Sequence, residues 1–191
     1  MNTPETETER LRLRKFTQDD IPALLEILQD GDVNRFLPWF PLKTMEEARN
    51  FYETRYSSVY AQPYGYAYAV CLKDDDTPVG YINADSSAYH DLGYGLKKEY
   101  WNQGIITEAG KALIAQIRKD GIFPFLTATH DVNNTASGKV MKKLGMNYMY
   151  SYEELWQPKN FKVTFRLYQI NFDPAAGVYM KYWNESETHY I

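Results

Sequence analysis

Residues 91–109 constrain the fold of this chain more than any other stretch of its sequence. Residues 91–96 are typical of a strand, a short loop containing Gly104 follows, and a helix is predicted to begin at about Ile105. A strand that enters a helix through a tight glycine turn leaves backbone N–H groups unpaired at the positive end of the helix dipole. Such a turn suits a phosphate or pyrophosphate group, although an ordinary strand–turn–helix connection has the same local pattern. The surrounding chain has to decide between these two interpretations.

The residues before this stretch predict a strand, two helices and a hairpin. Residues 10–16 alternate apolar and basic side chains, as a half-buried strand does. Residues 35–41 form an aromatic loop stiffened by two prolines, and residues 66–83 are predicted to form a β-hairpin around an acidic turn. Two capping boxes mark the starts of the helices on either side of the aromatic loop: Thr17 with Asp20, and Thr44 with Glu47.

The residues after it alternate between strand and helix patterns. The helix that begins near Ile105 ends at Gly121, a strand follows at 125–129, and another helix begins at about Thr135. Two long strands complete the pattern, at about 147–155 and 161–170. About seven strands and four helices, with strand–helix alternation only in the second half, predict a mixed sheet with helices on both faces in one domain.

Composition limits the classes of partner and the cellular compartment. A formal net charge of −4 argues against nucleic acid or an anionic membrane as the main partner. The single cysteine, Cys71, lies in an apolar run, which suits a buried structural thiol in a reducing compartment. The acidic, polar start of the chain is unlike a signal peptide, and no apolar run approaches the ~20 residues that span a bilayer. We therefore expect a cytoplasmic protein.

Four segments together carry a resemblance to a known family. In this order and spacing they resemble the GNAT N-acetyltransferase superfamily, and most of all its ribosomal-protein alanine N-acetyltransferase branch, over roughly residues 8–172. The segments are Glu9–Arg14; Phe36–Trp39 with Glu46–Ala48; Asp91–Ala109; and Asn134–Ser137 ending at Lys143–Met146.

The resemblance implies an architecture and a division of the chain. The implied fold is of the α/β (α+β mixed) class, with a central mixed, mostly antiparallel sheet of about seven strands that contains a splayed parallel pair. About four helices flank this sheet. Residues 1–172 then form a single acetyltransferase domain. The resemblance does not extend to residues 173–191, which their own composition predicts to be a C-terminal extension that packs on the domain or on a partner subunit. Val178, Tyr179, Tyr182 and Trp183 make this extension too apolar for a free end.

The resemblance also implies that acetyl-CoA is the donor and that no metal is needed. Pantetheine would pair with the backbone of the strand at Tyr94, Gly95 and Leu96, where the two parallel strands splay apart. The pyrophosphate would lie on the N–H groups of residues 102–107. One departure from the family pattern stands out, because Ile106 places a branched side chain where backbone must approach phosphate. The fit of Ile106 to the apolar face of the helix indicates that its side chain points into the core from the first turn. The predicted pyrophosphate loop consists of Asn102, Gln103, Gly104, Ile105, Ile106 and Thr107.

Catalytic residues are predicted from the chemistry of acetyl transfer and from the family pattern. In many members a tyrosine on the last helix acts as the acid for the leaving thiolate, but the matching position here is Val140. Ser137 matches a position near the CoA sulfur and Asn134 matches one that contacts pantetheine, although a first-turn residue and an N-cap would look the same. Asp91 is the predicted base, provided that burial raises its pKa. His130 and His90 are the alternative bases.

Aromatic residues are predicted to line the acceptor pocket, which the resemblance places between the helix–loop–helix insert and the last hairpin. Phe36 and Trp39 come from the insert, and Tyr152 comes from the hairpin. The same side chains fit a protein core or a homodimer contact equally well.

The predicted function is transfer of the acetyl group of acetyl-CoA to a primary amine by direct attack in a ternary complex. The amine belongs either to a protein N-terminus or to a small molecule. The alternative is a weakly active or inactive CoA-binding sensor or partner-binding module, which Val140 and Ile106 motivate.

Overall fold

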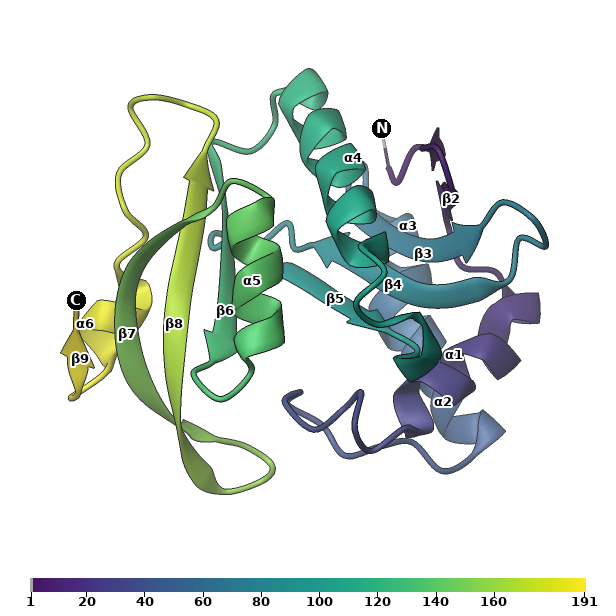
Figure 1. Ribbon diagram of the computed structural model, residues 1–191, viewed down its shortest axis with the longest axis horizontal. Helices are drawn as coiled ribbons and strands as arrows, with labels where there is room; N and C mark the ends of the chain where they lie inside the picture. The colour runs from purple at the N-terminus through teal and green to yellow at the C-terminus, as the bar shows by residue number, and fades with distance from the viewer. Residues whose placement is uncertain (1) are drawn as a thin grey trace.

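The computed structural model describes residues 2–191, and within them the strands form two antiparallel sheets that lie side by side (Figure 1). The first sheet has the order β1-β2-β3-β4-β5, and the second has the order β6-β8-β7-β9. The strands of the first sheet are β1 (Thr6–Glu7), β2 (Leu11–Arg14), β3 (Tyr66–Leu72), β4 (Pro78–Ala84) and β5 (Leu92–Leu96). Those of the second are β6 (Phe125–Asp131), β7 (Asn147–Trp156), β8 (Phe161–Asn171) and β9 (His189–Tyr190).

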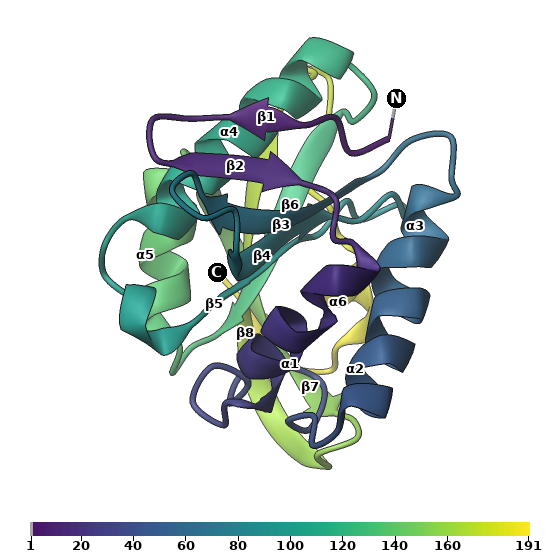
Figure 2. The same cartoon turned by 90° about the vertical axis from the view of Figure 1, so that its right-hand side faces the viewer.

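The helices cover both sides of this strand layer (Figure 2). The buried side chains of α4 and α5 belong to one core with strand residues of both sheets, and α1 and α2 pack on the opposite face of the first sheet. The helices are α1 (Ile21–Gln29), α2 (Met45–Tyr52), α3 (Ser58–Tyr60), α4 (Ile105–Asp120), α5 (Thr135–Lys143) and α6 (Lys181–Glu185). A π-helical turn, Glu53–Ser57, joins α2 to α3, and short 3₁₀ turns lie at Gln18–Asp20 and Lys98–Tyr100.

Strand β3 explains why two separate cores form. Its side chains alternate between the faces of the sheet, and almost all of them are buried. Tyr66, Tyr68 and Val70 enter the core beneath α4 and α5. The intervening small residues, Ala67 and Ala69, leave room for the aromatic rings that α1, α2 and the π turn bring to the other face. The strand is therefore apolar on both faces, which a continuous run of apolar residues reports in the sequence.

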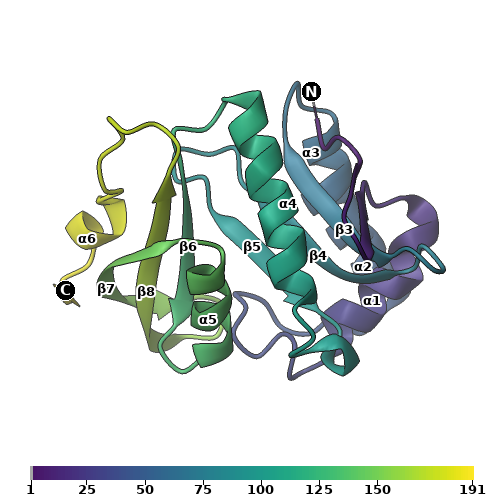
Figure 3. The ribbon, with the colours of Figure 1, turned by 45° about the horizontal axis from the view of Figure 1, so that its top comes forward.

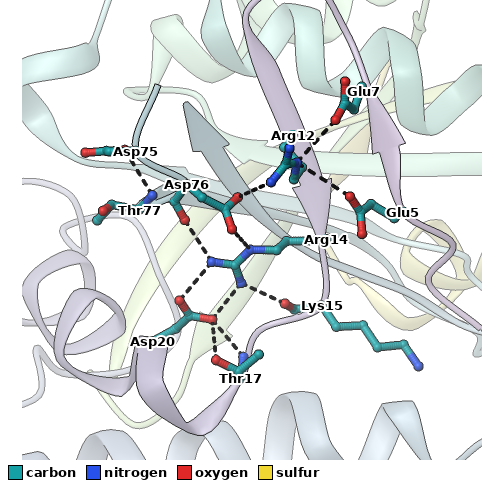
Figure 4. Close-up of polar contacts among 10 residues, drawn as sticks. All are labelled: Glu5, Glu7, Arg12, Arg14, Lys15, Thr17, Asp20, Asp75, Asp76 and Thr77. Carbon is teal, nitrogen blue, oxygen red and sulfur yellow. Dashed lines mark hydrogen bonds and ion pairs between the residues drawn. The ribbon is translucent and has the colours of Figure 1, made fainter. Parts of the chain in front are cut away.

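Arg14 ties α1 and the β3–β4 turn to the first sheet (Figure 4). Its guanidinium donates two hydrogen bonds to the Asp20 carboxylate, at 2.7 and 3.0 Å, and its Nε donates to Asp76 at 3.0 Å. Asp20 also closes the predicted capping box by accepting from the Thr17 N–H at 2.7 Å. Burial raises the pKa of Asp20, but the bonds from Arg14 and Thr17 outweigh it and hold the pKa below its usual value. This two-sided pairing satisfies a nearly buried charge.

The predicted mixed fold with antiparallel strands and flanking helices is confirmed. The structure adds that the sheet divides between β5 and β6. These strands meet at a single parallel bridge, Asp91 with Thr127, beyond which they diverge. The structure also places residues 173–191 against this chain's own second sheet, on the opposite side from α5 (Figure 3).

Candidate active site

The divergence of β5 and β6, which we call the splay, organises the candidate site. Thr127 holds the strands together at its base: its N–H donates to the His90 carbonyl at 3.2 Å and its hydroxyl donates to the Tyr89 carbonyl at 2.6 Å. Along β5, Leu92, Tyr94 and Leu96 face α4, and we call this the α4 face. Asp91, Gly93 and Gly95 face the other way, toward α1 and α2, and we call this the α1 face. A group lying in the splay therefore has access to both faces.

The loop after β5 enters α4 through a left-handed glycine. Gly104 is the N-cap with φ of +78°, and no side chain of residues 2–191 caps this end of the helix. The first helical bond runs from the Glu108 N–H to the Gly104 carbonyl at 2.9 Å, so the N–H groups of residues 105–107 precede it. This 16-residue helix therefore presents free donors and its positive dipole end at one mouth of the splay.

A shallow pocket of about 340 Å³ lies beside this helix end. Arg10, Lys111 and Lys143 bring positive charge to it, while Glu108 binds Arg10 at 2.7 Å. Arg10 also donates to the Gln103 carbonyl at 3.1 Å, which fixes the loop against β2. Glu9, Gly104 and Thr107 complete the lining.

The side chain of Ile106 points into the core, with 7% of its surface exposed. It packs with Ile105 beneath the first turn of α4, so its branched side chain is directed away from the exposed loop residues. The predicted conflict between this side chain and a bound phosphate does not arise at this position. Asn102 adopts a left-handed backbone with φ of +61°, and Asn102, Gln103 and Gly104 are exposed.

Ser137 and Tyr94 face each other across the splay. The Tyr94 hydroxyl lies 2.7 Å from the Ser137 hydroxyl and 3.1 Å from the Ser137 carbonyl. Asn134 is the N-cap of α5, and its side chain accepts from the Ser137 N–H at 3.3 Å. Burial raises the pKa of Tyr94, so the phenol stays protonated and can donate. Sequence reasoning assigned Tyr94 only a backbone role and did not find this side-chain contact.

Asp91 lies on the α1 face at the base of the splay. Its Oδ1 atom is shielded from solvent and has no hydrogen-bond partner among residues 2–191. Burial, and then the neighbouring charge of Asp85, raise the pKa of Asp91 to about 7. A carboxyl group with this pKa changes protonation near neutral pH, as a general base must.

Neither histidine shares this position. His130 is 4% exposed and lies on the α5 side, where a side chain at Gly138 would come within 2.6 Å of its Nε2 atom. Burial lowers the pKa of His130 and keeps it neutral. His90 stacks on Phe123 with ring centroids 4.1 Å apart, and burial lowers its pKa too. Both rings pack against neighbouring groups, and the Nδ1 atom of His90 and the Nε2 atom of His130 have no hydrogen-bond partner among residues 2–191.

The three predicted acceptor residues lie in two groups. Trp39 packs on Phe51 and donates to the Asn34 side chain at 3.0 Å, in the same loop as the half-buried Phe36. Lys159, in the β7–β8 turn, reaches this loop and donates to the Asn34 and Arg35 carbonyls at 3.2 and 3.0 Å. Tyr152 is instead buried under the C-terminal segment, where it stacks on Tyr182.

Two residues of β4 that sequence reasoning missed also reach the α1 face. Tyr81 pairs with Gly95, and its hydroxyl lies 2.8 Å from where a side chain at Gly95 would begin. That hydroxyl is buried and has no hydrogen-bond partner within the described part of the chain. The Asn83 amide lies over Gly93 in the same way, 3.2 Å from the corresponding point. Alternation along the predicted hairpin could have placed them, had its register been known.

No group of three or more His, Cys, Asp or Glu side chains among residues 2–191 is arranged to hold a metal ion. None of the helices described is long and apolar enough to cross a membrane.

Comparison with known proteins gives a consistent result. A sequence model of the acetyltransferase (GNAT) domain matches residues 10–147. The uncharacterized N-acetyltransferase YnaD of Bacillus subtilis (strain 168) is 28% identical over 142 residues, which cover 73% of this chain and 80% of that protein.

Solved structures agree with this result. An acetyltransferase (GNAT family) from Bacillus anthracis superposes with a TM-score of 0.78 at 27% identity, covering 88% of this chain and 99% of that one. RimL, a ribosomal L7/L12 alpha-N-protein acetyltransferase solved in complex with coenzyme A, gives a TM-score of 0.79 at 17% identity, covering 89% and 99% of the two chains.

Proposed function

Because this chain belongs to the GNAT acetyltransferase family, we propose that it transfers the acetyl group of acetyl-CoA to a primary amine within a ternary complex. One observation carries the proposal: a single splay joins a free helix N-terminus on one side to a half-buried carboxylate on the other, whose shielded Oδ1 atom has no partner among the described residues. We call residues 102–107 with Tyr94 and Ser137 the donor side. The acceptor side comprises Asp91 and the side chains around it on the α1 face.

The residues of the donor side fit acetyl-CoA. The N–H groups at the start of α4 would hold the pyrophosphate, with Arg10, Lys111 and Lys143 near the remaining phosphate charge. The open edge of β5 from Tyr94 to Leu96 would pair with the pantetheine arm, because β6 has already diverged from it. Bound there, acetyl-CoA would supply a thioester whose acyl carbon a neutral amine can attack and whose sulfur leaves as a thiolate.

Asp91 would accept the proton of the incoming ammonium group. Its pKa of about 7 leaves a substantial fraction of the carboxylate ionised at neutral pH while keeping it basic enough to take a proton. Its unpartnered Oδ1 atom is the one available for this contact. Deprotonation matters because only the neutral amine carries the lone pair that attacks.

Ser137 would donate a hydrogen bond to the departing thiolate, which then takes the proton that the attacking nitrogen loses. Tyr94 would orient Ser137, since the two hydroxyls are 2.7 Å apart and donation from Tyr94 leaves the Ser137 hydrogen free. This pair offers a hydroxyl donor although Val140 occupies the position where many family members have a tyrosine. We therefore favour a working enzyme over a CoA-binding sensor.

The acceptor is proposed to be a protein N-terminus or a small primary amine. Support for the first comes from the shared fold of RimL, which is named for action on a ribosomal protein N-terminus. We also propose that the reaction takes place in the cytoplasm. Burial raises the pKa of Cys71 to about 12, which makes this lone thiol unreactive.

The test is release of free CoA thiol from acetyl-CoA in the presence of a panel of peptides and small amines. We expect thiol release that depends on one class of amine, and a matching acetylated product by mass spectrometry. If acetyl-CoA raises the melting temperature but no amine in the panel causes thiol release, the sensor interpretation replaces the enzyme. If millimolar acetyl-CoA does not change the melting temperature, both are wrong.

A further inference from the structure

The C-terminal segment, residues 173–191, is fastened to the second sheet by a buried glutamine. Gln169, 1% exposed, donates from its side-chain amide to the Gly177 carbonyl at 2.8 Å and accepts from the Tyr179 N–H at 2.9 Å. The Tyr150 hydroxyl donates to the Tyr179 carbonyl at 2.7 Å. Strand β9 then pairs with β7 at Ser151 and Tyr152. Because these bonds join the segment to the domain along its length, its side chains hold fixed positions.

One side chain of this segment extends an aromatic stack toward Asp91. Tyr182 lies on Tyr152 with ring centroids 4.8 Å apart and planes within 7°, and Phe165, the partner of Tyr152 on β8, stacks on Tyr152 at 5.6 Å. Tyr182 also lies 6.5 Å from the ring of Tyr89, two residues before Asp91. Burial raises the pKa of Tyr182, and the nearby charge of Asp91 is the next cause. The contact with Tyr89 therefore places the Tyr182 ring near the start of β5, where the proposed base lies.

The surroundings of Asp91 determine how an acceptor amine can reach its carboxylate, and Tyr182 is one of the side chains concerned. Its Oδ1 atom is out of reach of solvent, although no hydrogen bond from residues 2–191 occupies it. On the far side, the side chains of Asn83 and Tyr81 lean over the glycine positions of β5. Asn83 thus flanks β5 on the β4 side, and Tyr182 lies beside Tyr89 on the other, so an ammonium group that approaches the carboxylate on the α1 face passes the Tyr182 ring.

We propose that residues 173–191 form part of the acceptor site and that Tyr182 restricts acceptors to amines whose adjoining carbon chain is slender. An N-terminal glycine, alanine or serine, or an amine on an unbranched methylene chain, passes this ring. A branched or aromatic group next to the amine meets it. This inference rests on the proposed acetyl transfer and assigns its acceptor selectivity to a segment beyond the residues that the family model matches.

Trp183 offers a matched control on the same helix. It is also half-buried and aromatic, but it packs edge-on against Tyr150 at 5.4 Å and on His189 at 4.0 Å. No aromatic contact in the described chain joins it to Tyr89 or Tyr152. Losing either side chain weakens the attachment of the segment, whereas only Tyr182 lies beside the route to Asp91.

The experiment measures thiol release with two peptides that differ only in their first residue, serine or leucine, and with propylamine against benzylamine, whose ring is attached to the carbon that bears the amine. The enzymes are the wild type, Tyr182→Ala, Tyr182→Phe and Trp183→Ala, each as the full chain. In Tyr182→Ala we expect the ratio of kcat/KM for the bulky acceptor to that for the slender one to rise about tenfold, as opening a hydrophobic wall allows. The ratio stays unchanged in Tyr182→Phe and Trp183→Ala, and the KM for acetyl-CoA stays within about twofold throughout.

If Tyr182→Ala and Trp183→Ala change the ratio equally, or neither changes it, the segment acts only through stability and the inference is wrong while acetyl transfer stands. If the wild type acetylates none of the four acceptors, the proposed function fails and this inference fails with it. Where Tyr182→Ala does not fold, Tyr182→Leu replaces it, since leucine keeps an apolar contact with Tyr152 but shortens the wall.

Discussion

The donor side is made mainly of backbone between residues 94 and 107, to which α5 adds Ser137, whereas the acceptor side is made of side chains from separate segments. The donor side depends on the open edge of β5, a left-handed glycine and the first N–H groups of α4. On the acceptor side, Asp91 is joined by Tyr81 and Asn83 from β4, Tyr152 from β7 and Tyr182 from α6.

This difference separates what each side can vary. Backbone donors bind any phosphate of suitable shape, so the donor side tolerates changes that keep its backbone conformation. Side chains determine shape and charge directly, and the acceptor side can therefore change its substrate with one substitution. Substitutions on the two sides should accordingly affect different kinetic constants.

The largest expected effect belongs to Asp91→Asn on the acceptor side. Removing the base should lower kcat/KM for the amine by about 10²–10³-fold, within the range of general acid–base catalysis, and leave acetyl-CoA binding unchanged. In the wild type, kcat/KM should rise with pH through about 7 as Asp91 ionises, and this limb should vanish in the variant. A pH profile of thiol release measures both.

Two measurements test what raises the pKa of Asp91: the pH profile of the Asp85→Asn variant and the pH dependence of stability. Burial, and then Asp85, raise the pKa of Asp91, so Asp85→Asn should move the rising limb toward lower pH. A carboxyl whose folded pKa is raised favours the folded state in its protonated form, and this contribution is lost as pH rises from about 4 through 7. Asp91→Asn should therefore melt higher than the wild type at pH 8. Equal melting temperatures at pH 8 would show that burial does not destabilise the ionised Asp91 carboxylate.

Ser137→Ala should have the next largest effect, on the donor side. We expect kcat to fall about 10–100-fold, at the low end for a general acid because a thiolate is a good leaving group. Tyr94→Phe should act through the same hydrogen and cost less. The double variant should lose less than the product of the single losses, since the two hydroxyls are 2.7 Å apart and form one unit. Multiplying effects would contradict the proposed pair.

Gly104→Ala should have the next largest effect, and Gly121→Ala is its control. The two glycines flank α4 with φ of +78° and +63°, so a side chain costs each a left-handed strain of about 1–2 kcal/mol. Only Gly104 lies at the proposed pyrophosphate site. Its substitution should raise the KM for acetyl-CoA about tenfold and leave that for the amine unchanged. If Gly121→Ala raises it as much, α4 matters only through stability.

The same contrast explains what the sequence predicts and what it does not. Gly104, the N-terminus of α4 and the inward position of Ile106 follow from local chain geometry and helical periodicity, and the structure has them as predicted. The division into two sheets, and the contacts of Tyr94 with Ser137 and of Tyr152 with Tyr182, depend on strand register and on segments 30 or more residues apart. No local pattern encodes such pairs, and the roles of all these residues stay predictions.

The smallest expected effect, that of Lys143→Gln, tests the outer limit of the donor side. Lys143 lines the exposed pocket beside Gly104, where solvent screens its charge, so losing it should raise the KM for acetyl-CoA only about threefold at low salt. The increase should shrink as ionic strength rises and should be absent with S-acetylpantetheine, which lacks the nucleotide phosphates. Lys119→Gln, near the far end of the same helix, should leave the KM values for acetyl-CoA and S-acetylpantetheine unchanged. If Lys143→Gln raises the KM for S-acetylpantetheine as much as that for acetyl-CoA, Lys143 supports the fold of this region and does not contact the nucleotide. The donor side would then end at the backbone of α4.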